Sequence, residues 1–282
     1  MVLSEPPADL SAIADNLVLG SNGIWEAAGH QDLAFAESDP TDWLRIEQTS
    51  YWYRHRNRCF VTLLEQFPPL GSLFEIGAGN GSVSLAIQSA AFSVVAVEPT
   101  ERWASNAKSR GVHTVVCADL DDARFHEGAL ANVGMFDVLE HIDNDAGFMR
   151  RVRRLMPAGG RFYCAVPAFT SLWSLEDTAA GHVRRYRLGD LTRRVAEAGF
   201  TVEHATYYFA PLVIPILVLR AIPTRLGIRR ARTAEQSASE HSLGEGIAGR
   251  LVQSALDQEI RWLAAGRRCP IGSSCFVVAR AT

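Results

Sequence analysis

The chain has 282 residues, of which 48% are hydrophobic and 21% are charged. This composition can bury a sizeable core and excludes a disordered protein. The net charge of -3 and the pI near 6.2 argue against a general nucleic-acid-binding surface, so we expect no nucleic-acid partner. The sequence therefore predicts one large folded domain with additions, or two small domains.

The five cysteines are scattered along the chain, and no C-x-x-C pair occurs. An odd number of cysteines without metal-ligand spacing predicts neither a metal site nor a disulfide framework, and favours a reducing compartment. The first residues include Glu5 and Asp9 but no basic region and no long apolar run. We therefore expect no signal peptide and a cytoplasmic location.

Residues 1–50 are expected to form an N-terminal cap or lid on the main domain, which spans 51–282. The large aromatic residues Trp25, Phe35 and Trp43 are too many for a solvated linker. The segment is therefore expected to pack on the main domain or to cover a pocket.

The stretch from Tyr51 to Phe67 has helical spacing and ends at Pro68. Its first part has three consecutive aromatic residues, 51–53, followed by Arg54, Arg56 and Arg58. Such side chains could stack on a base or clamp an anionic ligand. An amphipathic helix with its arginine heads in water is the alternative interpretation.

The stretch LFEIGAGNGS, from Leu73 to Ser82, combines an apolar strand with three glycines and is followed by a helical segment. Glycine permits backbone angles that a Cβ forbids and lets a ligand lie against the main chain. The dinucleotide fingerprint G-x-G-x-x-G does not fit, because its third glycine would fall at Ser82. A nucleotide-binding loop and a plain tight turn both remain open at this point.

Strand and helix signals then alternate, which predicts a parallel sheet with helices on both faces. Acidic residues lie at the ends of three expected strands: Glu98 just after 92–97, Asp119 just after 114–118, and Asp137 near the end of 133–138. Ligands in open α/β sheets bind at the carboxyl ends of the strands. Further strands are expected at 161–166, at 201–209 and, antiparallel to its neighbour, at 274–281.

The loop E-x-G-x-G-x-G and the string D-V-L-E-H-I at 137–142 together resemble the class I S-adenosylmethionine (SAM) dependent methyltransferases. The resemblance implies a Rossmann-like α/β fold with seven strands, mostly parallel with an antiparallel last strand, and SAM as the cofactor, released as S-adenosylhomocysteine (SAH). It also implies that the acid Glu98 bonds the ribose hydroxyls and that Asp119 bonds the adenine amino group. The full set of implied cofactor-binding residues is Glu75, Gly77, Ala78, Gly79, Gly81, Glu98, Pro99, Asp119, Leu120, Asp137 and Leu139.

Two more strings resemble a bacterial branch of this family, of the methyltransferase type 11/12 kind. The first is W-Y-x-x-R-N-R from Trp52, which implies that Tyr51, Trp52 and Arg56 line the active site. The second is G-H-x-R-R-Y at 181–186, within the expected active-site loop 168–187.

This loop is too long and too rich in polar groups for a simple connection. Arg184 or Arg185 is expected to hold an anionic group of the substrate, since arginine binds carboxylates and phosphates bidentately. His182 is the first candidate for a catalytic base, His141 is the second, and Tyr186 could relay a proton. The alternatives are a surface loop tied by salt bridges and a structural histidine at 141.

Residues 207–265 are expected to form a helical insertion before the last strand. The stretch 207–222 is strongly apolar, but it is too short to span a bilayer comfortably and contains Pro211 and Pro215. We expect it to pack beside the sheet, and membrane contact is the less favoured alternative.

Taken as a set, these motifs predict a SAM-dependent methyltransferase that acts on an oxygen or nitrogen of a small molecule. Secondary metabolism and sugar-linked or lipid-linked biosynthesis are the expected contexts, and a homodimer is possible. A SAM- or SAH-binding module without catalysis is the main alternative. An oxidoreductase that uses NAD is disfavoured by Ser82.

Overall fold

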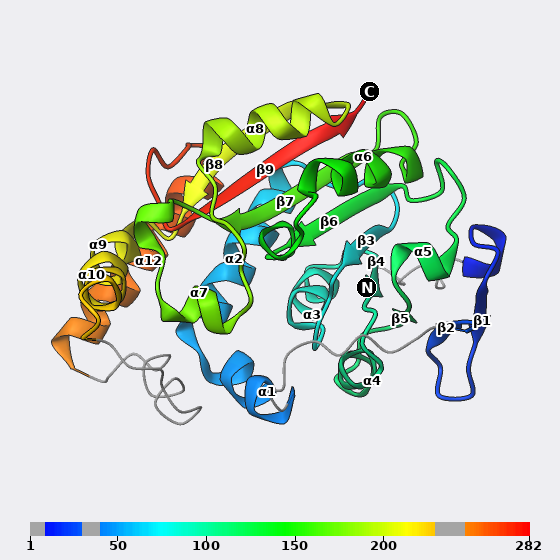
Figure 1. Ribbon diagram of the computed structural model, residues 1–282, viewed down its shortest axis with the longest axis horizontal. Coiled ribbons are helices and arrows are strands. Elements are labelled where there is room, and N and C mark those ends of the chain that lie inside the picture. The colour runs from blue at the N-terminus through cyan, green and yellow to red at the C-terminus, as the bar shows by residue number, and fades with distance from the viewer. Residues whose placement is uncertain (1–8, 30–39, 229–245) are drawn as a thin grey trace.

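The computed structural model describes residues 9–29, 40–228 and 246–282, and Figure 1 shows their arrangement. Phe35 of the expected cap and residues 229–245 of the expected insertion lie outside the described residues.

The fold is an α/β fold built on one mixed sheet, which has nine strands within the described residues (Figure 1). The strand order is β1-β2-β5-β4-β3-β6-β7-β9-β8. The strands are β1 (Leu17–Leu19), β2 (Trp25–Ala27), β3 (Leu73–Ile76), β4 (Val94–Val97), β5 (Thr114–Cys117), β6 (Asn132–Phe136), β7 (Arg161–Pro167), β8 (Phe200–Tyr208) and β9 (Ser274–Ala281). Strands β2 to β7 pair in parallel, and β9 is antiparallel to both of its neighbours, β7 and β8.

The short central strands are buried at every position, because helices cover both faces of the sheet. One face carries α2 (Tyr51–Gln66), α3 (Ser82–Ser89), α4 (Glu101–Ser109) and α12 (Ile247–Ala264), and the other carries α6 (Asp145–Leu155) and α8 (Leu188–Glu197). Alternate residues of β4 point to opposite faces: Val94 packs with α2 and α3, whereas Val95 packs with α6. The sequence prediction of a parallel sheet covered on both faces is confirmed.

The expected number of seven strands is wrong, because β1 and β2 form an additional hairpin. They flank a turn at Asn22-Gly23, and β2 then pairs in parallel with β5. Strands of three residues are too short for a recognisable alternation of apolar and polar side chains. This hairpin lies within residues 1–50 and extends the edge of the sheet, whereas the role of this segment as a cap stays a prediction.

The remaining short elements lie at the strand ends and in the connections. They are η1 (Leu10–Ala12), α1 (Pro40–Thr49), α5 (Leu120–Ala123), η2 (Leu139–His141), η3 (Thr170–Leu172), α7 (Leu175–Ala179), η4 (Ala210–Leu212), α9 (Val213–Ile216), η5 (Leu217–Ala221) and α10 (Ile222–Arg225). Tyr207 and Tyr208 belong to β8, so the helical insertion begins at Ala210. None of the helices in the described ranges combines the length and the hydropathy that crossing a membrane requires.

Candidate active site

A cavity of about 590 Å³ lies at the carboxyl ends of β3, β4, β5 and β6. Parallel strands bring their carboxyl ends to one edge of the sheet, so side chains that follow different strands meet there. The volume is within the range of roughly 300–1,000 Å³ found for small-molecule sites. Nine residues of the implied cofactor set line the cavity: Glu75, Gly77, Ala78, Gly79, Glu98, Pro99, Asp119, Leu120 and Asp137.

Two glycines bring the main chain to the cavity wall. Gly77 and Gly79 have φ values of 75° and 54°, which side chains rarely adopt. A Cβ at Gly77 would lie 2.8 Å from Cγ2 of Val138, and a Cβ at Gly79 would lie 3.1 Å from the ring of Trp103. The loop therefore packs too closely against Val138 and Trp103 for side chains at these two positions, and its bare backbone lines the cavity.

Gly81 and Leu139 lie behind the cavity wall rather than in it. A Cβ at Gly81 would come 2.8 Å from Val112 and 2.9 Å from Ala107, so this glycine permits close packing against α4. Leu139 is fully buried in the core beside β6. The structure thus places these two members of the implied set in supporting positions.

Glu98 links the end of β4 to the glycine loop. Its Oε2 accepts a hydrogen bond of 2.8 Å from the backbone N–H of Gly79, and its Oε1 accepts one of 2.9 Å from the N–H of Thr100. The carboxylate is buried at the cavity, where the resemblance implies contact with ribose hydroxyls. Its hydrogen bond with Gly79 also holds the glycine loop next to the end of β4.

Asp119 is held in place as the N-cap of α5. Its Oδ1 accepts hydrogen bonds of 2.7 Å from the backbone N–H groups of Asp121 and Asp122. This cap fixes the carboxylate beside Leu120 on the cavity wall. Both residues line the cavity, and their role in adenine binding stays a prediction.

Glu75 is a buried carboxyl at the end of β3. Burial raises its pKa to about 8, although a hydrogen bond from Ser84 and the nearby charge of Arg56 oppose that rise. At pH 7 the group is therefore mostly protonated. A cation in the cavity would favour its ionised form.

Arg56 and Asp137 form an ion pair at the end of β6. Nη1 of Arg56 donates to Oδ2 of Asp137 at 2.9 Å, and the guanidinium lies 4.8 Å from the ring centre of Tyr53. Asp137 has a φ of 59°, a conformation that costs a non-glycine residue free energy and is common at functional sites. Both charged residues line the cavity, as expected for Arg56 and Asp137.

The other two expected substrate residues of α2 point elsewhere. Trp52 stacks on Phe209, with ring centres 5.2 Å apart and planes 12° apart, and Tyr51 packs against the same core. Tyr53 and Glu47 line the cavity in their place. The sequence reasoning missed both residues, because the rotation of the helix decides which of three neighbouring aromatic side chains faces inward.

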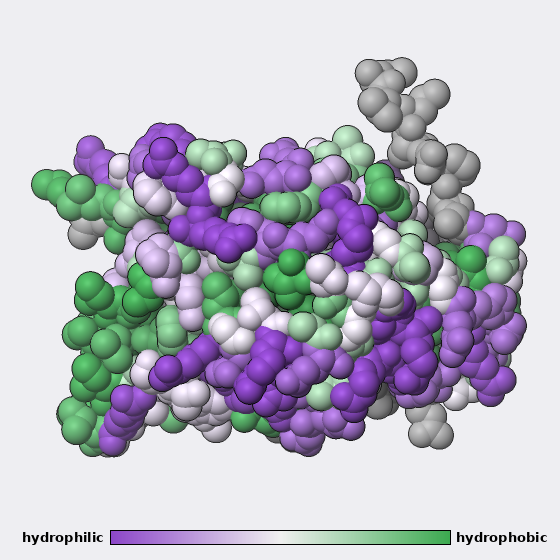
Figure 2. All heavy atoms as spheres, turned by 90° about the horizontal axis from the view of Figure 1, so that it is seen from above, coloured by the Kyte–Doolittle hydropathy of each residue, from purple (hydrophilic) through white to green (hydrophobic). Residues whose placement is uncertain are grey.

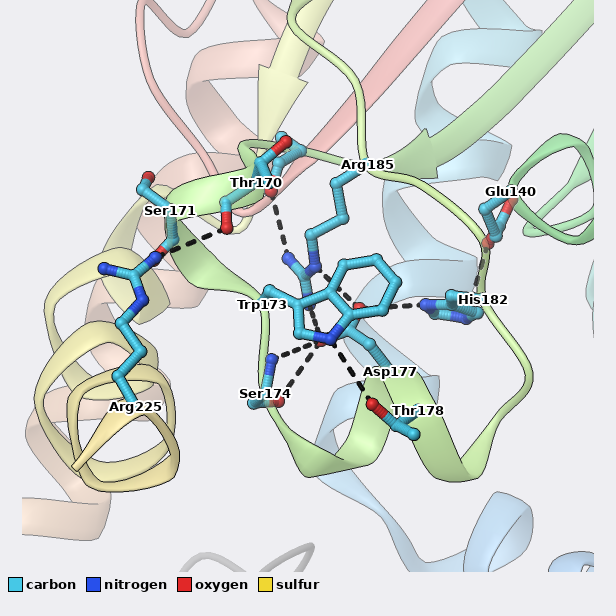
Figure 3. Close-up of polar contacts among 11 residues, drawn as sticks. Glu140, Thr170, Ser171, Trp173, Ser174, Asp177, Thr178, His182, Arg185 and Arg225 are labelled. Carbon is cyan, nitrogen blue, oxygen red and sulfur yellow. Dashed lines mark hydrogen bonds and ion pairs between the residues drawn. The ribbon is translucent and has the colours of Figure 1, made fainter. Parts of the chain in front are cut away.

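Asp177 is the centre of the active-site loop (Figure 3). Its carboxylate accepts hydrogen bonds from Nδ1 of His182 at 2.9 Å, from Nε of Arg185 at 2.6 Å and from the backbone N–H of Ser174 at 2.8 Å. These donors hold the pKa of Asp177 down at about 2, although burial opposes them. Arg185 also donates to the carbonyl of Ala168, so its guanidinium is engaged within the loop and does not reach the cavity.

Arg184 and Tyr186 attach the same loop to the start of α6. Arg184 pairs with Asp145 at 3.1 Å, and the hydroxyl of Tyr186 donates to the same carboxylate at 2.9 Å and to the carbonyl of Leu139 at 3.2 Å. Tyr186 is buried in the core. The structure therefore places neither of these two expected site residues at the cavity.

His141 lines the cavity, and His182 lies directly behind it. Their ring centres are 4.9 Å apart and the ring planes are nearly perpendicular. Nε2 of His182 lies 3.9 Å from Oε1 of Glu140, and neither oxygen of this fully buried carboxyl accepts a hydrogen bond within the described part of the chain. Burial raises the pKa of Glu140, and burial together with His182 lowers the pKa of His141.

Glu140 and Asp177 are the two residues behind the histidines that the sequence reasoning did not select. Glu140 is part of the D-V-L-E-H-I string and could have been found there. Asp177 gave no comparable signal, because its importance comes from the number of donors that converge on it.

The model of the family described as "Methyltransferase domain" matches residues 49–205, which is more than half of the chain. The chain belongs to this methyltransferase family. The resemblance to class I SAM-dependent methyltransferases is confirmed, and with it SAM as the cofactor.

Curated relatives of this methyltransferase are found among mycobacteria. A protein of Mycobacterium tuberculosis named a probable S-adenosylmethionine-dependent methyltransferase is 26% identical over 158 residues, which are 55% of this chain and 57% of the relative. A protein of Mycolicibacterium smegmatis with a similar name is 24% identical over 161 residues, 56% of this chain and 62% of the relative. The methyltransferase thus matches less than two thirds of the length of these relatives.

Solved structures support the fold of the methyltransferase. The phosphoethanolamine N-methyltransferase 2 of Haemonchus contortus, in complex with SAM, has a TM-score of 0.52 at 15% identity over 86% of this chain and 56% of that chain. A SAM-dependent methyltransferase structure from Thermotoga maritima has a TM-score of 0.50 at 15% identity over 86% of this chain and 94% of that chain. At these identities the similarity concerns the fold alone.

Proposed function

We propose that this protein transfers the methyl group of SAM to an oxygen or nitrogen of a small molecule. One observation carries the proposal: His141 lies on the wall of the cavity that the glycine loop enters, and His182, held by Asp177, lies behind it. Transfer to a hydroxyl or an ammonium group requires removal of a proton, which a positioned histidine can accept.

The residues of the cavity fit the cofactor in shape and in chemistry. The bare backbone at Gly77 and Gly79 leaves room for the methionine and ribose portions, and the carboxylates of Glu98 and Asp119 are acceptors for ribose hydroxyls and for an adenine amino group. Bound SAM supplies a methyl group on a positively charged sulfur, which leaves as a neutral thioether. The protein has to align the acceptor with that methyl group and remove a proton.

His141 is the better candidate for the base, which reverses the order favoured from the sequence. Burial and the neighbouring His182 lower its pKa, so the ring is neutral at pH 7 and able to accept a proton. Asp177 fixes one nitrogen of His182, and the T-shaped contact then fixes the ring of His141. We therefore assign His182 and Asp177 as positioning residues.

The cover of the site supports a small acceptor. Ala179 and Ala180, at the end of α7 and just after it, line the cavity from the active-site loop, and Glu47 of α1 and Tyr53 of α2 line it from the N-terminal side. A cavity covered by several separate segments can enclose a small molecule, and it suits such an acceptor better than it suits a macromolecule. Secondary metabolism or the modification of sugar-linked or lipid-linked intermediates is the proposed context.

Calorimetric titration of the purified protein with SAM, SAH and NAD in parallel tests the proposal. Micromolar binding of SAM and SAH alone is the expected result, and a screen of acceptors with labelled methyl groups then follows. Binding of NAD alone would overturn the proposal. Binding of SAM without transfer to any acceptor would instead favour a binding module that acts through partners.

A further inference from the structure

The helical segment after β8 carries large apolar side chains on its outer surface. Helices α9, η5 and α10 run from Val213 to Arg225 without a break, and the described chain continues to Ile228. The most exposed of these side chains are between 66% and 72% exposed, which leaves most of their surface in water. We name as the apolar face the six residues Ile214, Val218, Leu219, Ile222, Leu226 and Ile228.

Figure 2 shows hydrophobic side chains gathered at the end of the molecule where Figure 1 places α9 and α10. A helix on the surface of a soluble protein normally turns its apolar residues inward and its polar residues outward. Here the residues at 214, 218, 222 and 226 recur every four positions and are all exposed and apolar. Soluble monomers rarely leave a contiguous apolar surface of this kind without using it.

The charge of the segment indicates what covers this face. Between His204 and Ala234 the sequence contains five arginines and no aspartate or glutamate, although the whole chain has a net charge of -3. Two of the arginines, Arg220 and Arg225, lie within the helical segment itself. Apolar helices with arginines beside the apolar residues are typical of segments that lie in the interface of an anionic bilayer.

A second copy of the chain fits this face less well. A two-fold contact brings the same surface of both copies together, so the arginines of one copy would face those of the other. Like charges placed against each other across an interface disfavour association. An anionic partner has the complementary charge.

We propose that the apolar face docks the protein on an anionic membrane surface. The side chains of Ile214, Leu219 and Leu226 enter the boundary between headgroups and acyl chains, and Arg220 and Arg225 contact the lipid phosphates. From the sequence we expected this stretch to pack beside the sheet. Leu212 packs in the core with residues of the strands and Ala221 is also buried, but the apolar face is exposed.

Docking would also affect the active-site loop. Nη2 of Arg225 donates to the carbonyl oxygens of Ser171 at 2.8 Å and Thr170 at 3.4 Å, in the loop that carries Asp177 and His182 (Figure 3). The docked helix therefore holds this loop close to the lipid surface. A membrane-held acceptor is then the favoured substrate class. This choice of substrate rests on the proposed function, but the docking on the membrane is independent of it.

Sedimentation of the full chain with vesicles tests the docking without any measurement of methyl transfer. Vesicles of phosphatidylcholine alone are compared with vesicles that also contain phosphatidylglycerol, at low and at high salt. The test variant is Leu219→Glu/Ile222→Glu. The matched control is Val18→Glu/Leu19→Glu, because these two residues of β1 are also exposed, at 65% and 54%, but lie at the opposite edge of the sheet.

We expect wild type and control to bind only the anionic vesicles, with binding that weakens as salt rises, and the test variant to bind at least tenfold more weakly. Absence of binding by the wild type would overturn the proposal, and so would equal losses in the two variants. Light scattering provides a further check. A wild-type dimer that the test variant dissociates, without vesicle binding, would assign the face to a second copy and overturn the proposal as well.

Discussion

Replacing Glu75 with glutamine tests whether a buried carboxyl helps to bind the cationic methyl donor. Glu75 lines the cavity, and burial raises its pKa to about 8, against the opposing effects of Ser84 and Arg56. The carboxyl must lose its proton before it can attract a positive charge. The affinity for SAM should therefore rise with pH until the group is ionised in the free protein.

The size of the effect follows from the pKa of about 8. The ionised fraction of such a group is about 3% at pH 6.5 and about 76% at pH 8.5. If the carboxylate form alone binds SAM well, the affinity rises about 25-fold across this range, which is about 1.9 kcal/mol. Glutamine keeps the shape of the side chain and removes the ionisation, so the Glu75→Gln variant should lose this increase.

Calorimetric titration of wild type and Glu75→Gln with SAM at pH 6.5, 7.5 and 8.5 measures, for each protein, the slope of SAM affinity against pH. Ionisation of SAM itself affects both proteins equally and cancels in the comparison. Titration with SAH, which lacks the sulfonium charge, should show a smaller slope in the wild type. Equal slopes for SAM in the two proteins would refute the reasoning.

Four further substitutions test the glycine loop, the two histidines and the attachment of the active-site loop. Gly79→Arg should abolish SAM binding in calorimetry, because the new side chain fills the loop. The control Gly189→Arg should bind SAM normally, because Gly189 is exposed in α8 with open space around it. Normal SAM affinity of Gly79→Arg would show that the loop is not part of the site. His141→Ala should lower kcat by about 10²-fold or more with SAM affinity nearly unchanged, and His182→Ala should lower it less and alter the pH profile. If either histidine variant keeps the wild-type rate with every accepted substrate, that histidine has only a structural role. Loss of wild-type activity with a chelator would instead indicate a metal between the two histidines. Tyr186→Phe should lower the free energy of unfolding in denaturant by about 1–3 kcal/mol and leave kcat unchanged, because its hydroxyl bonds only the fold; reduced turnover at full stability would contradict that role.

The position of the cofactor site could be predicted from the sequence, because local patterns determine it. An apolar strand followed by glycines at alternate positions predicts a turn with backbone angles that only glycine adopts easily. The structure has such positive φ values at Gly77 and Gly79. Glu98 and Asp119 each follow a predicted parallel strand, and Asp137 lies near the end of a third. Because parallel strands share one carboxyl edge, the order of motifs along the chain was sufficient to bring these acids together.

The edge of the sheet could not be predicted in the same way. Strands β1 and β2 have three residues each, and isolated strands of that length are not stable. They exist because β2 pairs with β5, which lies about ninety residues further along the chain. Only the tertiary structure supplies that partner.

The tertiary structure also decided which polar side chains face the cavity. Tyr53 lines it and Trp52 does not, because one residue along a helix turns the side chain by about 100° and only packing fixes the rotation of the helix. Arg184 and Tyr186 are engaged by Asp145, which lies far from them in sequence. A motif specifies which chemical groups are present, whereas burial and long-range partners determine which of those groups remain available for function.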